Sequence, residues 1–343
     1  MNRKSLLALL LLAVMPMTLE AALRTSRNKT GAITIKLGTV APKDSSFHRI
    51  LDDMGKNWRT QNVDLKIYAG GVRGGEAEMV QHLRSGALDA ALLTGVGLGT
   101  IDPSAEALQS FPMMFRSLGE VDFAAAKLQP RLERSLRDKG FVVLFWCDAG
   151  WVRIFSKQPI TRPDDLRKLK LFTWAGDVLA VDLYKANGFR PVPLETNDIL
   201  PALQTGMIEA VPMPPYVALM TQVSTHAPNM LEIDWSPLVG ALVVSEKSWN
   251  KLTPDMQREL ARAAADAGQQ MKAQNRRESD MSVEAMKKRR LRVTTVTPSV
   301  EAEWRRVAER TYPRLRGQKI PADLFDEMTR LLAEYRRDNG APQ

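Results

Sequence analysis

The strongest constraint on the fold is a pattern that occurs twice along the chain. Residues 35–41, IKLGTVA, resemble residues 169–175, LKLFTWA, and residues 83–90, LRSGALDA, resemble residues 203–210, LQTGMIEA. Both halves predict a strand, a helix, a second strand, a second helix ended by a glycine, and a third strand. Two such βαβαβ units predict an α/β chain with two lobes of similar build. A chance similarity of short strings is the alternative, and the matching order of elements argues against it.

The length of 343 residues fits about two domains, at ~150 residues per domain. We place the first lobe at residues 33–148 plus 237–290 and the second lobe at residues 149–236 plus 291–343. The chain then crosses between the lobes more than once. Such a division predicts a hinged clamp, and hinge closure around a ligand is a known use of that geometry.

The other elements follow from local signals. Ser45 or Ser46 can cap the first helix, and a long helix rich in Ala, Arg and Gln is expected from Thr253 or Asp255 to about Arg290. Strands are predicted at residues 33–40, 63–68, 88–93, 141–147, 170–174, 190–194, 207–213, 237–245 and 291–296. Shorter helices are predicted at residues 46–60, 76–86, 121–139, 177–187, 197–206 and 214–224, and two amphipathic helices end the chain.

Residues 1–22 have the features of a secretory signal peptide. Arg3 and Lys4 form a positive start, and residues 6–15 form an apolar run that is too short to span a membrane well. No later segment of the sequence is long and apolar enough to cross a bilayer. We therefore expect a soluble mature protein outside the cytoplasm, with an uncleaved N-terminal anchor as the alternative.

The charged and reactive residues favour binding over catalysis. The net charge is +9, but no nucleic-acid motif accompanies it. Cys147 is the single cysteine, so no internal disulfide can form, and the apolar run FVVLFWC predicts that its side chain is buried. His48, His82 and His226 belong to no recognisable motif, and no nucleophile with a base, paired carboxylates or metal cluster is visible. We expect no catalytic residues, metal, cofactor or nucleic-acid partner.

Residues 151–215 are expected to form half of a ligand cleft. Three strands of this stretch end beside one another, and open α/β sheets bind ligands at the carboxyl ends of their strands. Trp151 and Arg153 share one face of a strand, as do Phe172 and Trp174. Each candidate has a structural alternative: an ion pair for the arginine, core packing for the others. The predicted ligand-binding residues are Arg153, Phe172, Trp174, Met213, Pro214, Trp151, Glu76, Thr39, Thr94, Trp235 and Tyr216.

Several motifs together resemble the solute-binding subunits of tripartite ATP-independent periplasmic (TRAP) transporters, of the dicarboxylate-binding type. The matching strings are IKLGTVAP, YAGGVRGGEAEMVQHLRSGALDA, ITRPDDLRKLKL, GFRPVPL, ALQTGMIEA and the run from Gly150 to Lys157. The resemblance covers roughly residues 33–296. It implies a periplasmic-binding-protein type II fold, with a hinge and a long helix spanning both lobes. It also implies a periplasmic location and delivery of a solute to the permease subunits of a TRAP transporter.

Two positions depart from the pattern of this family. Phe172 stands where the family has a carboxylate-clamping arginine, and Met213 stands where it has an asparagine, while Arg153 matches the other family arginine. Arginine grips a carboxylate with two hydrogen bonds, which phenylalanine cannot do. We therefore expect a larger organic acid with a hydrophobic body, held by Arg153 or by backbone N–H groups near residues 74–76 or after Asp177. A solute-sensing protein for a membrane receptor and a secreted enzyme on the same frame are the alternatives.

Overall fold

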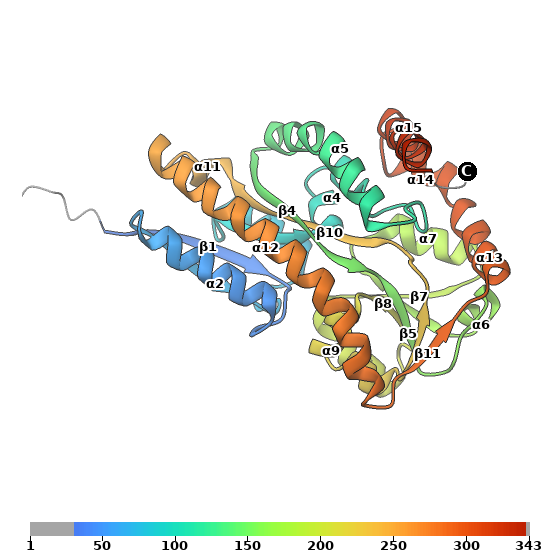
Figure 1. Ribbon diagram of the computed structural model, residues 1–343. Coiled ribbons are helices and arrows are strands. Elements are labelled where there is room, and N and C mark those ends of the chain that lie inside the picture. Colours follow the sequence, from blue (N-terminus) through green and yellow to red (C-terminus); the bar gives the residue numbers. More distant parts are fainter. Residues whose placement is uncertain (1–30, 341–343) are drawn as a thin grey trace, which may run out of the picture. The chain divides into compact units, whose positions relative to one another are not determined.

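The computed structural model describes residues 31–340 of the chain (Figure 1). Its strands form one five-stranded and one six-stranded sheet, which confirms the predicted α/β fold with two lobes. The predicted signal peptide at residues 1–22 lies outside the described residues. Within residues 31–340, no helix combines the length and the apolar character that crossing a bilayer requires.

The first sheet has the strand order β2-β1-β3-β10-β4. Strand β1 pairs in parallel with β3, and β10 runs antiparallel to both β3 and β4. Strands β3 and β10 are buried along almost their whole length, so their sequences are continuous apolar runs rather than alternating ones. The strands are β1 (Ile33–Thr39), β2 (Val63–Tyr68), β3 (Ala90–Thr94), β4 (Phe141–Trp151) and β10 (Pro237–Ser245).

The second sheet has the strand order β11-β9-β5-β8-β6-β7. Strand β6 pairs in parallel with β7 and β8, and β5 runs antiparallel to β8 and β9. We did not predict β9, which the sequence analysis left without an element. The strands are β5 (Arg153–Ser156), β6 (Lys170–Trp174), β7 (Arg190–Leu194), β8 (Ala210–Met213), β9 (Asn229–Glu232) and β11 (Arg292–Thr295).

The internal repeat is visible in both sheets. The first strand of each βαβαβ unit lies between the second and the third, as β2-β1-β3 in one sheet and β7-β6-β8 in the other. The last helix of each unit ends at a glycine in the left-handed conformation, Gly86 with φ 80° and Gly206 with φ 74°. The helices of the two units are α2 (Ser46–Arg59) and α3 (Glu76–Ser85), and α7 (Val178–Ala186) and α8 (Ile199–Thr205).

A single helix of 34 residues, α12 (Pro254–Lys287), contacts both lobes. It packs along β4 and α2 of the first lobe and against α9 (Pro215–Met220) of the second, and it runs as the long orange helix in Figure 1. Gly268 permits the close approach to β4, since a Cβ there would lie 2.6 Å from the Cβ of Phe145. The lobe-spanning helix implied by the family resemblance is confirmed.

Two further segments cross between the sheets side by side. Strand β4 continues into β5 through Val152, and residues 233–236 lead from β9 back to β10. The backbones of these crossings are bonded to each other: the N–H of Val152 donates to the carbonyl of Ser236 at 2.8 Å, and the N–H of Trp235 donates to the carbonyl of Val152 at 3.2 Å. The two crossings thus form a short two-stranded connection between the sheets.

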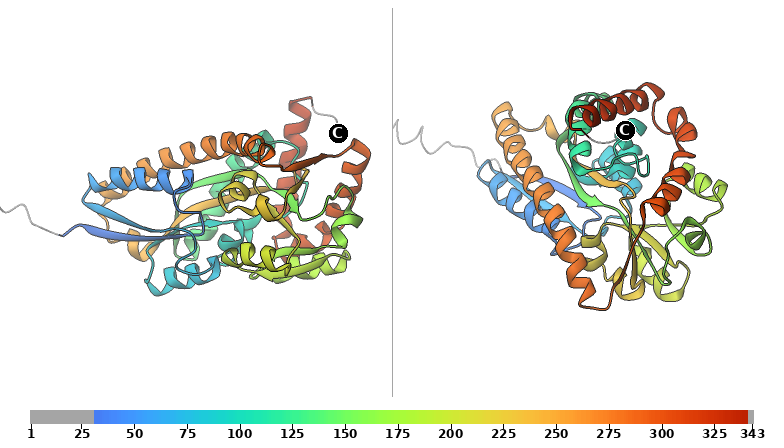
Figure 2. Two further views of the ribbon diagram at one scale, coloured as in Figure 1. Left: turned by 90° about the horizontal axis from the view of Figure 1, so that it is seen from below. Right: turned by 45° about the vertical axis from the view of Figure 1, so that its right-hand side comes forward.

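The described part of the chain ends in three helices, α13 to α15, rather than the predicted two. They are drawn in orange-red to dark red in Figure 2. Gly317, with φ 86°, breaks the helical geometry within the last residues of α14, and α15 begins as a separate helix. Helix α13 packs against α6 (Pro163–Arg167) of the second lobe, whereas α15 packs against α5 (Leu118–Asp138) of the first. The three helices are α13 (Pro298–Glu309), α14 (Tyr312–Gln318) and α15 (Ala322–Asp338).

Candidate functional site

A cavity of about 260 Å³ is lined by residues from both sheets. Thr39 and Thr94, the last residues of β1 and β3, come from the first lobe. Trp174 and Met213, the last residues of β6 and β8, come from the second. All four strands present their carboxyl ends, which is where open α/β sheets bind ligands.

The wall contributed by the second lobe is apolar and aromatic. Phe172 and Trp174 meet edge to face, with ring centroids 5.5 Å apart. Both rings line the cavity together with Met213 and Pro214. Phe172 and Met213 also belong to a hydrophobic core cluster, so their inner sides are packed while part of each side chain reaches the cavity. This surface suits the hydrophobic body of a ligand.

The cavity continues toward the C-terminal helices. This part is lined by apolar side chains of α7 and the turn that follows it, of the crossing segment and the start of β10, and of α13 and α14. Trp235 is fixed there by an edge-to-face contact with Trp304 of α13, with centroids 6.0 Å apart. The apolar residues concerned are Leu183, Tyr184, Phe189, Trp235, Leu238, Val307, Ala308 and Leu315.

Two threonine hydroxyls in the cavity wall have no hydrogen-bond partner within the described residues. They are the Oγ1 atoms of Thr173, near the end of β6, and of Thr196, before α8. The side chain of Thr173 is almost completely buried, with 4% of the residue exposed. A buried hydroxyl without a partner is unfavourable, so a ligand group that bonds to it gains free energy.

A charged cluster in the cavity wall joins three separate segments. The ammonium Nζ of Lys319, just after α14, lies 2.6 Å from Oε2 of Glu106 and 2.5 Å from Oδ2 of Asp177. Glu106 ends the short 3-10 helix η1 (Pro103–Glu106), and Asp177 is the N-cap of α7. Burial raises the pKa of Glu106 to about 7, against the opposing effect of Lys319.

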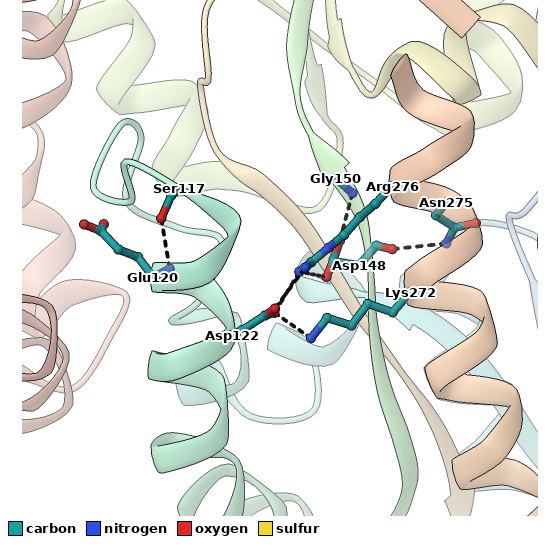
Figure 3. Close-up of polar contacts among 8 residues, drawn as sticks. All are labelled: Ser117, Glu120, Asp122, Asp148, Gly150, Lys272, Asn275 and Arg276. Carbon is teal, nitrogen blue, oxygen red and sulfur yellow. Dashed lines mark hydrogen bonds and ion pairs between the residues drawn. The ribbon is translucent and has the colours of Figure 1, made fainter. Parts of the chain in front are cut away.

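A second charged network holds α12 beside the cavity (Figure 3). The guanidinium of Arg276 bonds to both carboxylate oxygens of Asp148 on β4, at 3.0 and 2.6 Å, and to both of Asp122 on α5, at 2.9 and 2.8 Å. Lys272 adds an ion pair to Asp122 at 2.5 Å. Burial opposes the charge on Arg276, but its bonds to the two aspartates outweigh burial and keep its pKa above the usual value. Asp148 reaches the cavity, yet its oxygens are already bonded.

The structure places seven of the eleven predicted ligand-binding residues in the cavity wall: Thr39, Thr94, Phe172, Trp174, Met213, Pro214 and Trp235. Arg153, Trp151, Glu76 and Tyr216 lie elsewhere. Glu76 accepts bonds from the backbone N–H of Thr94 at 2.5 Å and from its hydroxyl at 2.6 Å, and burial raises its pKa. The hydroxyl of Tyr216 accepts a bond from the N–H of Ser46 at 2.7 Å, which ties α9 to α2.

The position of Arg153 matters most among these four, because this residue was expected to hold the carboxylate of the ligand. Its Nη1 lies 2.7 Å from Oδ1 of Asp234, and it lines a separate polar depression that also includes Arg305 and Glu301. Trp151 packs against the core cluster of α5 and the C-terminal helices. Arg153 therefore does not line the cavity with Phe172 and Trp174 in this structure. The structural alternative for this residue, an ion pair, is what the structure shows.

The charged cluster and the two free hydroxyls were not among the predicted ligand-binding residues. Asp177 was identified as a helix cap and as one place for backbone donors, but nothing in the sequence connects it to Glu106 or Lys319, which are 71 and 142 residues away. Thr173 sits between the two aromatic candidates on β6, where strand alternation predicts the opposite face, so the same-face pattern did not select it. Cys147 is buried as expected, and burial raises the pKa of its thiol well above the usual value.

Known proteins match the chain along most of its length. The family model of bacterial extracellular solute-binding protein family 7 matches residues 37–318. A solute-binding protein of Roseobacter denitrificans is 26% identical over 260 residues, covering 73% of this chain and 78% of that protein. The 2,3-diketo-L-gulonate-binding periplasmic protein of Escherichia coli is 23% identical over 278 residues, covering 79% and 83%.

The fold matches as well. A crystal structure of a TRAP periplasmic solute-binding protein from Ralstonia eutropha, with bound (S)-2-acetolactate, superposes with a TM-score of 0.82 at 21% identity, covering 88% of this chain and 99% of that one. The expected TRAP-type resemblance is confirmed by the family match, by these relatives and by the shared fold. The chain belongs to family 7 of the bacterial extracellular solute-binding proteins.

Proposed function

We propose that this protein captures an organic acid with a hydrophobic body in the periplasm and delivers it to the membrane permease of a TRAP transporter. The observation that carries the proposal is the cavity at the strand ends of both lobes, whose wall is mostly apolar and aromatic with few polar groups. Relatives support an organic acid, since one is named for 2,3-diketo-L-gulonate and one holds (S)-2-acetolactate, whereas the hydrophobic body rests on the apolar cavity wall alone. The transport partner follows from the same family.

The departures at Phe172 and Met213 give the proposal its specificity. Both side chains face the cavity, where they offer apolar contact in place of hydrogen-bond donors. Burying a carboxylate without a partner is costly, so a small dicarboxylate is disfavoured at this wall. An apolar or aromatic body of the ligand gains about 25 cal/mol for each Å² that it buries against these side chains.

Calorimetric titration of the purified protein tests the ligand class. We would titrate phenylacetate, indole-3-acetate and octanoate as apolar acids, with succinate, malate and galacturonate as polar ones. At least one apolar acid should bind with a dissociation constant on the order of micromolar, which is about 8 kcal/mol. Tight binding of the polar acids with none of the apolar ones would contradict the proposal. Loss of uptake of the bound acid in cells lacking this gene would test the delivery step.

We also propose that the lobes close on the ligand about the paired crossings at Val152 and Trp235, as the expected hinge implies. For the division itself we propose residues 33–148 and 237–290 for the first lobe, with residues 149–236 and 291–311 in the second. The packing of α15 on α5 supports assigning residues 312–338 to the first lobe instead. Small-angle scattering should show a smaller radius of gyration with a bound apolar acid, and an unchanged radius at saturation would contradict closure.

A further inference from the structure

The cluster of Glu106, Lys319 and Asp177 is the charged end of an otherwise apolar cavity. Among the described residues that line the cavity, Lys319 is the single basic side chain. Its own exposure is small, 13% of the side chain. The cluster contains residues of both lobes, because η1 follows the first βαβαβ unit within the first lobe and α7 belongs to the second unit. A ligand bound there contacts both lobes at once, as closure requires.

The cluster carries more negative than positive charge. Two carboxylates face one ammonium, and their attraction keeps the pKa of Lys319 above its usual value although burial acts to lower it. Asp177 has a second hydrogen-bond donor, because its Oδ1 accepts the backbone N–H of Ala180 at 3.0 Å at the start of α7. Within the described residues, Glu106 has no backbone donor of that kind. Its Oε2 accepts only the hydroxyl of Ser110, at 3.0 Å, in addition to Lys319.

Glu106 is therefore the member of the cluster that takes up a proton. The charged groups that face it are Lys319, after α14, and Asp177, at the start of α7. Its Oε1 lies against Gly99 of the helix α4 (Gly95–Gly99), so closely that a Cβ added to this glycine would be 2.1 Å away. Its Oε2 accepts a bond from the hydroxyl of Ser110. Desolvation and the repulsion of Asp177 bring the pKa of Glu106 to about 7, so protonation near neutral pH costs little.

The donors that result match a carboxylate. An ammonium has three N–H groups, and the contacts of Lys319 with Glu106 and Asp177 leave the third for a ligand. A protonated Glu106 adds an O–H donor next to it. We propose that Lys319 and protonated Glu106 together bind the carboxylate of a monocarboxylic acid, which enters the cavity with one proton taken from solvent onto Glu106. The inference rests on the proposed function, that the ligand is an organic acid.

The same arrangement limits the ligand to one carboxylate. A second carboxylate inside the cavity would meet Phe172, Trp174 and Met213 and no second basic side chain among the described lining residues. An ionised group buried without a partner is strongly disfavoured. The free hydroxyls of Thr173 and Thr196 can bond to a neutral polar group, such as a hydroxyl or carbonyl of the ligand, which adds selectivity without a second charge.

Calorimetry between pH 6 and pH 8 tests this inference with phenylacetate, indole-3-acetate and octanoate and with their neutral amides. These acids are ionised throughout that range, so a change in affinity reports on the protein. For the wild type, the affinity for the acid should fall about tenfold from pH 6 to pH 8, and titrations in buffers of different ionisation enthalpy should show about one proton taken up per ligand at pH 8. The amides should bind with no such dependence.

Two variants and a matched control separate the parts of the site. Glu106→Gln keeps the size and a donor but cannot ionise, so it should bind the acids equally at both pH values and more tightly than wild type at pH 8. Lys319→Met should weaken acids at least tenfold and leave amides nearly unchanged. Lys185→Met, at an exposed position on α7, should behave like wild type. If Lys319→Met does not fold, the Glu106→Gln profile alone decides.

Each other outcome overturns a defined part. One such outcome is that the wild type binds the acids and that Lys319→Met and the control Lys185→Met bind them with equal affinity. The carboxylate site is then wrong, while the proposed function stands. Proton release on binding, or an unchanged pH dependence in Glu106→Gln, likewise overturns the inference alone. If none of the apolar acids binds and 2-phenylethylamine does, the ligand is a cation. In that case both the proposed function and this inference fail.

Discussion

The two βαβαβ units have the same strand order but present different side chains at the same place. The first unit ends its strands in threonines, Thr39 and Thr94, whose hydroxyls already bond to nearby backbone or to Glu76. The second unit ends its strands in Phe172, Trp174 and Met213. The backbone thus determines where a ligand sits, and the few residues at the strand ends determine what it is. Each wall also carries one carboxylate of the charged cluster, Glu106 on the first and Asp177 on the second.

The largest expected effect is on the pH dependence of stability, through the carboxylates of Glu106 and Asp177. Because the folded pKa of Glu106, about 7, lies above its ordinary value of 4.5, its contribution to stability is present below pH 4.5 and lost as pH rises through 7. The loss amounts to about 3 kcal/mol. Glu106→Gln should flatten the decrease in unfolding free energy between pH 5 and 8, measured by denaturant titration. Asp177→Asn should move the decrease to lower pH, because Asp177 raises the pKa of Glu106. Parallel profiles for wild type and Glu106→Gln would contradict this difference.

The aromatic wall should matter more to affinity than the threonine wall. Trp174→Ala removes apolar contact of about 2 kcal/mol, or roughly thirtyfold in affinity, for an acid and for its amide alike. Thr39→Val should cost about 1 kcal/mol or less, because the hydroxyl already accepts a bond from the N–H of Ala41 at 3.1 Å. Titration of both variants with the same apolar acid gives the comparison, and a larger loss in Thr39→Val would reverse the roles of the two walls.

Arg153 should affect stability slightly and affinity not at all. It pairs with Asp234, of which 38% of the side chain is exposed, and such pairs contribute about 1 kcal/mol or less. Arg153→Met should therefore lower the unfolding free energy by no more than that amount and leave acid binding unchanged in calorimetry. A tenfold weaker affinity for acids but not for amides would show that the arginine turns toward the ligand when the lobes close.

The smallest effect on ligand affinity is expected when Phe172 alone is changed to the arginine of the family pattern. Phe172→Arg adds a cation to the second wall, but Met213 and Trp174 stay in place and succinate still lacks a second partner. We expect no succinate binding in the micromolar range, together with lower stability because residue 172 is 3% exposed and packed in the core. Micromolar succinate binding by this variant would mean that one residue alone separates the two ligand classes.

The repeat, the strand-end cleft and the lobe-spanning helix could be predicted because each leaves a local trace: a matched string, an apolar run, a capping glycine. The aromatic wall followed from two side chains two residues apart on one strand. The cluster around Lys319 could not be predicted, because it unites an irregular segment, a helix cap and a C-terminal turn through tertiary contacts alone. For Arg153, the local element was predicted but the partner of the side chain was not. Its place on the strand was right, but strand periodicity does not reveal that Asp234, 81 residues later, lies beside it.

Native mass spectrometry of the protein purified from its own source tests the central claim most directly, because it shows which molecule the cavity holds without a choice of candidates. The account predicts one small molecule per chain, released on denaturation and identified as a monocarboxylic acid with an apolar or aromatic body. Trp174→Ala and Lys319→Met, prepared in the same way, should carry less of it. A bound C4-dicarboxylate or amine would contradict this prediction. Occupancy in both variants equal to that of the wild type would contradict it as well.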